Sequence, residues 1–449
     1  MTVTATRTHA TPERSVKDRR AAALERLNAA APGTVASGPR KGHVRRAKPT
    51  RRAVPRVSAP SQQLGPPPRI YYGIFVIVAT FVLFGLVMVL SATSARNVGG
   101  DESPYAIFQR QALWAMLGLL VTLIVVKVPY QRWRTAAVPI AILAGGAMLL
   151  PFAPGIGAEI NDATSWVRFG GISFQPSEFL KLAAIGFLAD YFARHQDQVH
   201  VPRHGLWPMT LVAAVCAGVA FAQGDLGAAI VLSAIVLAIG VVAGLPLVHV
   251  AMVSCGGTLL AAAAIMSSPR RLHRFTAFRD IEGNKDYLAY QSWRGLVAIA
   301  NGGVTGSGVG GSNAKLGYLP LAHSDFIFAV IADELGLVGS VAVIGGFMLL
   351  VYFGVQAALA APDRFGMLLA GGISAWFGVQ AIVNMGGVAG VMPVTGLTLP
   401  FFSAGGTSLF VSMLAAGLLL NVSRRAVTAP RAERTKSIKR PRRLRPALA

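Results

Sequence analysis

The feature that most limits how this chain can fold is a series of apolar stretches, each close to the length of a membrane span. A helix needs about 20 mostly apolar residues to cross the hydrocarbon core of a bilayer. Ten such stretches follow one another, at residues 71–93, 108–128, 136–153, 177–193, 207–222, 226–243, 246–266, 325–357, 365–390 and 405–423. The chain is 53% hydrophobic and only 14% charged, which excludes an ordinary soluble domain of 449 residues. We therefore predict an all-α polytopic membrane protein with about ten transmembrane helices.

Most of the positive charge lies near the two ends of the sequence. Residues 1–69 hold 15 Lys and Arg against 3 Asp and Glu, and residues 424–449 hold 10 against 1. Neither stretch has the hydrophobic pattern of a folded domain, so we expect a disordered basic tail over 1–69, a membrane domain over 70–424 and a second basic tail over 425–449.

Basic residues beside spans favour the cytoplasmic side, and an even number of spans places both tails there. We therefore predict a multi-pass protein of the cytoplasmic (inner) cell membrane with both termini cytoplasmic. Such tails are attracted to anionic headgroups, and we expect no nucleic-acid binding.

With this topology, residues 267–324 form a large extracytoplasmic loop between the seventh and eighth spans. The loop is basic and contains Arg274 and Lys315, although positive charge usually stays on the cytoplasmic side. Loops of this length can cross the membrane regardless of charge, so the topology stands. Two interpretations remain open. The cations are simply solvated, or they bind an anion at the outer leaflet, a role for which Arg and Lys are suited.

Acidic side chains stand where this loop enters the eighth span. Asp325 lies at the boundary, and Asp333 and Glu334 follow inside the apolar run. Carboxylates at the mouth or inside of a span are costly and by default indicate a functional site. The alternative for Asp325 is that it caps the N-terminus of a helix. His323, two residues earlier, is either an ordinary loop residue or a group that positions Asp325.

A second polar segment, NDATSWVRFGGISFQPSEFLKLA over residues 161–183, leads into the fourth span and contains Arg168. Pro176 is typical of the first turn of a helix. Glu178 and Lys181 are three residues apart, so they share one helix face and can pair. They form either a structural ion pair or part of a substrate site, since charged groups inside a membrane usually find partners.

The outward polar segments, in this order on ten spans, resemble the shape, elongation, division and sporulation (SEDS) family. The most specific pieces are SWVRFGGISFQPSEFLKLA, KLGYLPLAHSDFIFAVIADELG and the segment from Asn384 through PVTGLTLPFFSAGGTS. The similarity covers roughly residues 70–424. The sequences LSATSAR and SAGGTS resemble the division members of this family in actinobacteria more than its elongation members.

This resemblance implies a peptidoglycan glycosyltransferase that polymerises lipid II at the outer face of the cytoplasmic membrane, in septal cell-wall synthesis during division. It implies that Asp325, in the motif HSDF, is the essential aspartate of the family. Glu178 and Lys181 match the family's conserved pair in the fourth span. The implied partners are a class B penicillin-binding protein and other proteins of the division machinery.

For that reaction we expect Asp325 to act as the general base of an inverting transfer. Lys315, Arg274 and Arg168 are the first candidates to neutralise the departing undecaprenyl pyrophosphate, and we place His323 among the substrate-binding residues. A divalent cation, Mg or Mn, could share that task, and no other cofactor is expected.

Two alternatives remain open. One is a lipid II flippase or transporter, which would need polar groups along a path through the membrane. The other is the elongation-type member of the same family.

Overall fold

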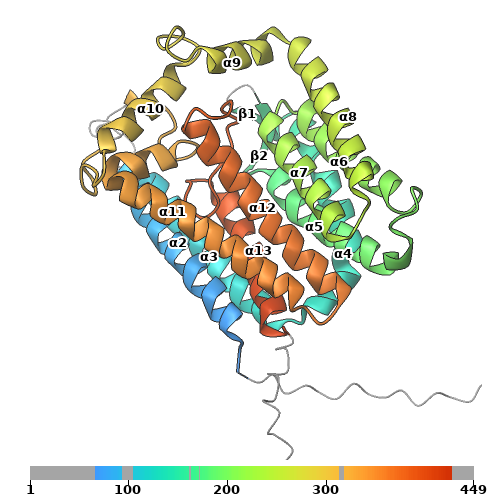
Figure 1. Cartoon of the computed structure of the whole chain (residues 1–449). Helices are drawn as coiled ribbons and strands as arrows, with labels where there is room; N and C mark the ends of the chain where they lie inside the picture. Colours follow the sequence, from blue (N-terminus) through green and yellow to red (C-terminus); the bar gives the residue numbers. More distant parts are fainter. Residues whose placement is uncertain (1–65, 94–104, 161–162, 171, 313–317, 427–449) are drawn as a thin grey trace, which may run out of the picture. The chain divides into compact units, whose positions relative to one another are not determined.

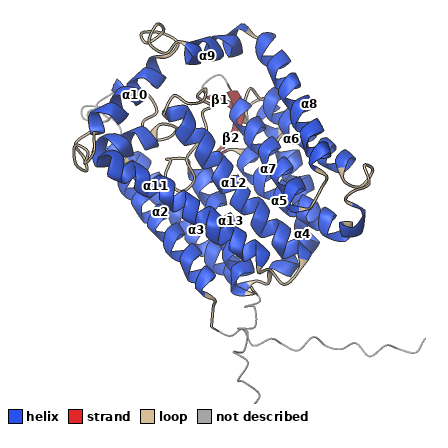
Figure 2. Cartoon of the chain, viewed as in Figure 1, coloured by secondary structure: helices blue, strands red, loops and turns tan. Residues whose placement is uncertain are grey.

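The computed structural model describes residues 66–426 apart from 94–104, 161–162, 171 and 313–317, and this part of the chain is predominantly helical (Figures 1 and 2). Helices lie at all ten positions expected from the sequence. They are α2 (Arg69–Thr93), α3 (Ala106–Lys127), α4 (Tyr130–Ala147), α5 (Pro176–Arg194), α6 (Leu206–Ala222), α7 (Leu226–Val242), α8 (Leu247–Met266), α11 (Ile327–Leu359), α12 (Arg364–Val388) and α13 (Gly406–Arg424).

Seven of these helices are long and apolar enough to span a membrane, by their length and composition. Two more, α6 and α7, are shorter apolar helices. The tenth, α5, has 19 residues and carries four charged side chains, which lowers its apolarity. The prediction of an all-α polytopic membrane protein is confirmed.

The connections between the spans contain structure that the sequence patterns did not predict. Before α5 lies a short antiparallel sheet in the order β1–β2–β3, with β1 at Gly157–Ile160, β2 at Ala163–Phe169 and β3 at Ile172–Phe174. The long loop after α8 contains two helices, α9 (Pro269–Arg279) and α10 (Tyr290–Gly302). Two of the three strands have only three or four residues, too short for an alternating pattern to stand out.

The last two spanning helices form the buried centre of the membrane domain. About 67% of the spanning window of α12 and 83% of that of α13 is buried, against 0% for α8. α12 packs against α5, α7 and α11, and α13 packs against α3 (Figure 1). Because a buried helix is shielded from lipid on most sides, α12 and α13 can carry polar side chains that meet partners inside the protein.

The eighth spanning helix, α11, is broken near its start. Gly336 has a left-handed backbone (φ 64°, ψ −157°) inside the helix. The break leaves backbone N–H and C=O groups of α11 without partners inside the helix, and they bond instead to the glycine-rich segment 303–308. The hydrogen bonds join Leu337 N to Gly303 O (2.9 Å), Val338 N to Val304 O (3.3 Å), Ser307 N to Asp333 O (2.9 Å) and Gly308 N to Glu334 O (2.9 Å). The break therefore leaves these buried backbone groups satisfied, as burial requires.

Replacing Gly306 with Ala is expected to destabilise this junction strongly, on the order of 4 kcal/mol. Gly306 has φ +79°, and a Cβ there would overlap the carbonyl oxygen of Glu334. Gly308 is a matched control, because it has φ +90° but open space around a Cβ. Gly308→Ala should cost only the backbone strain, about 1–2 kcal/mol. Thermal unfolding midpoints in detergent would check this order, and equal midpoints for the two variants would contradict it.

Candidate active site

The side chain of Asp325 lies in the loop that leads into α11 and lines a small cavity. The remaining walls come from α12 and from the connection between α12 and α13, and are formed by Val383, Asn384, Gly387, Val388, Val394, Thr395, Gly396 and Leu397. Most of these residues are apolar or glycine, so the carboxylate is poorly solvated. Burial is the main cause that raises the pKa of Asp325 to about 6. The hydroxyl of Ser324 opposes this shift, and the negative charge of Asp225 adds to it.

The loop that carries Asp325 is held through its backbone by the connection between α12 and α13. The hydroxyl of Ser403 donates a hydrogen bond to the carbonyl of Ser324 (2.6 Å). The backbone N–H of Ala404 donates to the carbonyl of His323 (2.8 Å). These bonds do not use the Asp325 side chain, which stays available for chemistry while its position is restrained.

A buried ion pair lies next to this region, at the start of α5. Lys181 Nζ donates to Glu178 Oε1 at 2.8 Å, and the two side chains are 0% and 4% exposed. Lys181 Nζ also donates to Gln380 Oε1 (2.8 Å), which accepts a second bond from Trp376 Nε1 (2.6 Å). Gln380 Nε2 in turn donates to the carbonyl of Thr398 (2.8 Å). Thr398 directly follows the stretch that lines the Asp325 cavity, so a chain of hydrogen bonds connects the ion pair to that cavity.

Asp225 is a second carboxylate of the same region. It caps the N-terminus of α7, where Oδ1 accepts from the backbone N–H of Ala228 (2.8 Å) and Oδ2 accepts from Gln175 Nε2 (2.8 Å). Burial raises the pKa of Asp225, whereas the Ala228 bond and the charge of Lys181 lower it. Asp225 therefore lies within electrostatic range of the ion pair in α5 and of Asp325.

The predicted site residues lie in different environments. Glu178 and Lys181 pair with each other, as their spacing suggested, and connect to the loop beside Asp325. The side chain of Arg168, on β2, is exposed. The side chain of His323 is partly buried.

The other two predicted cations cannot be placed. Lys315 lies outside the described residues, as does the side chain of Arg274, whose backbone is in α9. A role of Arg168, Arg274 and Lys315 at a pyrophosphate stays a prediction.

Sequence reasoning did not assign a function to three polar residues of α12. Trp376, Gln380 and Asn384 are spaced four residues apart, so they lie on one face of the helix. All three are buried. The signal that could have found them is the presence of an amide at this spacing twice within an otherwise apolar span, since such groups in a membrane need partners.

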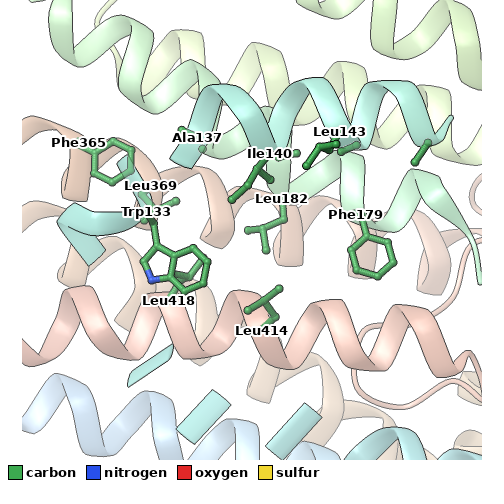
Figure 3. A pocket seen from close by; sticks show the side chains of 14 residues that line it. Trp133, Ala137, Ile140, Leu143, Phe179, Leu182, Phe365, Leu369, Leu414 and Leu418 are labelled. Carbon is green, nitrogen blue, oxygen red and sulfur yellow. The ribbon is translucent and has the colours of Figure 1, made fainter. Parts of the chain in front are cut away.

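An apolar groove of about 320 Å³ lies between α4, α5, α12 and α13. Its lining side chains include Trp133 at one end and Phe179 at the other, with Leu182 and Leu414 between them (Figure 3). All of the residues that line it are apolar or aromatic, apart from a single glycine. Phe179 follows Glu178 directly, so one end of the groove reaches the helix turn that carries the buried ion pair.

The fold and this site together define a multi-pass helical membrane protein with acidic and basic side chains buried at one end of its helices. The family model of FtsW, RodA and SpoVE, described as cell cycle protein, matches residues 72–428. The chain belongs to this family.

Curated relatives agree with the family match. A protein of Trichlorobacter lovleyi named probable peptidoglycan glycosyltransferase FtsW is 36% identical over 357 residues, covering 80% of this chain and 94% of that protein. Stage V sporulation protein E of Bacillus subtilis is 34% identical over 349 residues, covering 78% and 95%.

Solved structures agree as well. A chain of a peptidoglycan synthase complex that coordinates polymerization and crosslinking has a TM-score of 0.65 and 30% identity, covering 79% of this chain and 97% of that chain. The rod shape determining protein RodA of Thermus thermophilus has a TM-score of 0.58 and 28% identity, covering 80% and 98%.

Proposed function

We propose that this chain is a peptidoglycan glycosyltransferase that polymerises lipid II into glycan strands at the outer face of the cytoplasmic membrane. The observation that carries the proposal is the position of Asp325, a carboxylate with a pKa of about 6 in a cavity at the end of the membrane helices. At neutral pH such a group is mostly ionised, and it is a better base than an ordinary aspartate. The names of the relatives support the same activity.

In this reaction a hydroxyl of the acceptor sugar attacks the anomeric carbon of the donor sugar. Asp325 takes the proton of that hydroxyl as the new C–O bond forms. The bond from the anomeric carbon to the pyrophosphate oxygen breaks, and undecaprenyl pyrophosphate leaves. One base opposite the leaving group gives inversion at the anomeric carbon, so no second carboxylate is needed as a nucleophile.

The buried pair of α5 and the apolar groove fit a lipid-linked sugar as substrate. Glu178 Oε2 is buried and has no hydrogen-bond partner among the described residues, so it can accept a bond from a substrate group. Beside it the groove offers an apolar surface of the kind that a polyprenyl chain needs. We assign the groove to the lipid and the Glu178–Lys181 end to the sugar and phosphate groups next to it.

We also propose that both termini are cytoplasmic, that the protein works at the division septum and that it acts with a class B penicillin-binding protein. The basic tails favour the cytoplasmic side. The similarity to a chain of a peptidoglycan synthase complex supports a partner of this kind.

The function can be tested with purified full-length protein, its transpeptidase partner and labelled lipid II. We expect the mixture to form glycan polymer, resolved by gel electrophoresis. A transporter would instead move labelled lipid II across liposomes without forming polymer. Movement without polymer would therefore overturn the glycosyltransferase proposal.

Polymerisation is expected to fall as the pH is lowered through about 6, the pKa of Asp325. Only the ionised carboxylate can accept a proton, so the rate rises with pH through this value and then levels off. Asp225→Asn should move this fall in rate, the acidic limb of the pH–rate profile, to lower pH, since the charge of Asp225 helps raise the pKa of Asp325. Initial rates across the pH range would check both statements. A flat profile, or a limb that Asp225→Asn moves upward, would contradict them.

A further inference from the structure

Asn384 joins the loop of Asp325 to the connection between α12 and α13. It lies in α12 with 4% of its surface exposed. Its Nδ2 donates to the carbonyl of Asp325 (2.9 Å) and to the carbonyl of Leu397 (2.6 Å). These two carbonyls determine which way the amide points, because the flipped orientation would place Oδ1 against two acceptors.

The other end of this amide is unsatisfied. Oδ1 of Asn384 is buried and has no hydrogen-bond partner among the described residues. Asn384 also lines the same cavity as Asp325. Asn421 in α13 provides a contrast, because its Oδ1 accepts from Tyr130 N (3.3 Å) while its Nδ2 donates to Val125 O (2.6 Å). A buried acceptor left without a donor is unfavourable and calls for an explanation, such as a ligand that supplies the donor.

We propose that Asn384 Oδ1 and the Asp325 carboxylate together form the subsite that receives the acceptor sugar, with Asn384 accepting a hydrogen bond from one of its hydroxyl or amide N–H groups. This inference rests on the proposed function. Asn384 would hold one donor of the sugar while Asp325 accepts the proton of the attacking hydroxyl. Because the same side chain also holds the backbone of Asp325, the sugar and the base are positioned relative to each other by one residue.

The chemistry of the cavity selects a neutral hydrogen-bond donor over a phosphate. Asp325 and Asn384, whose Oδ1 has no donor among the described residues, both line it, and its described lining contains no Lys or Arg. Phosphate oxygens are themselves acceptors and would be repelled by both groups. The cavity holds only about 10 Å³, room for one water-sized group. It can therefore receive a single hydroxyl or amide N–H of the acceptor sugar, and the pyrophosphate of the donor lipid lies outside it.

The test compares Asn384→Ala with Asn421→Ala, each of which removes a buried amide of α12 or α13 that donates to backbone carbonyls. The full-length protein with its partner would be assayed at several lipid II concentrations, and unfolding midpoints would be measured in parallel. We expect both variants to lose thermal stability, but only Asn384→Ala to lose kcat/KM for lipid II, by roughly tenfold.

Asn384→Ser is a second variant at the same position. Its hydroxyl is too short to reach the carbonyls that Nδ2 contacts, and it places no acceptor at the position of Oδ1. It should therefore lose kcat/KM to a similar extent as Asn384→Ala, although it keeps a polar side chain.

A pH profile tests whether position 384 lies within electrostatic range of the Asp325 carboxylate, as the subsite requires. Asn384→Asp places a second carboxylate beside Asp325 and should move the acidic limb of polymerisation to higher pH. Asn421→Asp should leave the limb in place. The other charged groups around Asp325 are unchanged in both variants: Asp225 before α7, Glu178 and Lys181 in α5, which act on Asp225, and the titratable His323 on the same loop.

Two outcomes would overturn the subsite. One is a kcat/KM of Asn384→Ala and Asn384→Ser no lower than that of Asn421→Ala. The other is an acidic limb that Asn384→Asp does not move. If wild-type protein makes no polymer at all, the proposed function fails instead, so the two failures are distinguishable.

Discussion

Asp325→Asn is expected to abolish most glycan polymerisation while the protein still folds, inserts and binds its partner. The substitution keeps the size of the side chain but removes the base, which should cost ~10²–10⁴-fold in rate. The loop should stay in place, because it is held through backbone carbonyls by Ser403 and Ala404. Removing a poorly solvated charge should not lower stability. Polymerisation of labelled lipid II and unfolding midpoints of the same preparations would check both parts.

Asp363→Asn is the matched control for this prediction. Asp363 caps α12, where Oδ1 accepts from the N–H of Gly366 (2.7 Å), at the end of the helix away from Asn384 and the cavity. An asparagine can still cap a helix. We expect this variant to polymerise lipid II at close to the wild-type rate. Near-normal synthesis by correctly inserted Asp325→Asn would remove Asp325 from the catalytic role.

Lys181→Met is expected to have the second largest effect, on both stability and activity. The change leaves Glu178 buried without its cation, and breaking one side of a buried pair costs about 3–5 kcal/mol. It also removes the hydrogen bond from Lys181 to Gln380. Gln380 in turn holds the carbonyl of Thr398 beside the cavity. Unfolding midpoints and polymerisation rates would be measured for Lys181→Met, Glu178→Gln and the double variant. The double variant should lose less than the sum of the single losses, because the two groups interact directly.

Arg194→Met provides the comparison for a pair whose cation is exposed. Arg194 bonds to Asp190 but its side chain is 58% exposed, and Asp190 keeps a second partner in Arg134. Because the cation is exposed and the buried Asp190 carboxylate stays paired with Arg134, stability and activity should change much less than in Lys181→Met. If Glu178→Gln and Lys181→Met reduce polymerisation but leave the unfolding midpoint untouched, the pair acts on the substrate and not on the fold.

Local sequence pattern is enough to predict the features of this protein that depend on neighbouring residues alone. The bilayer requires apolar segments of a given length, so the ten helices could be read from composition along the chain. Glu178 and Lys181 could be paired from their spacing, because residues three apart meet on a helix whatever surrounds it. Asp325 stood out because a carboxylate at the edge of an apolar run is costly anywhere.

The tertiary structure decided every feature that depends on segments far apart in the chain. No local pattern shows that the broken backbone of α11 at Gly336 bonds to residues 303–308, since either segment alone has unsatisfied groups. The same holds for Gln380, which meets Lys181 across 199 positions of sequence, and for Asn384, which meets Asp325 across 59. An amide in a span signals only that a partner exists. Which partner it meets depends on how α5, α11 and α12 pack, and that packing is set by the shapes of whole helix surfaces.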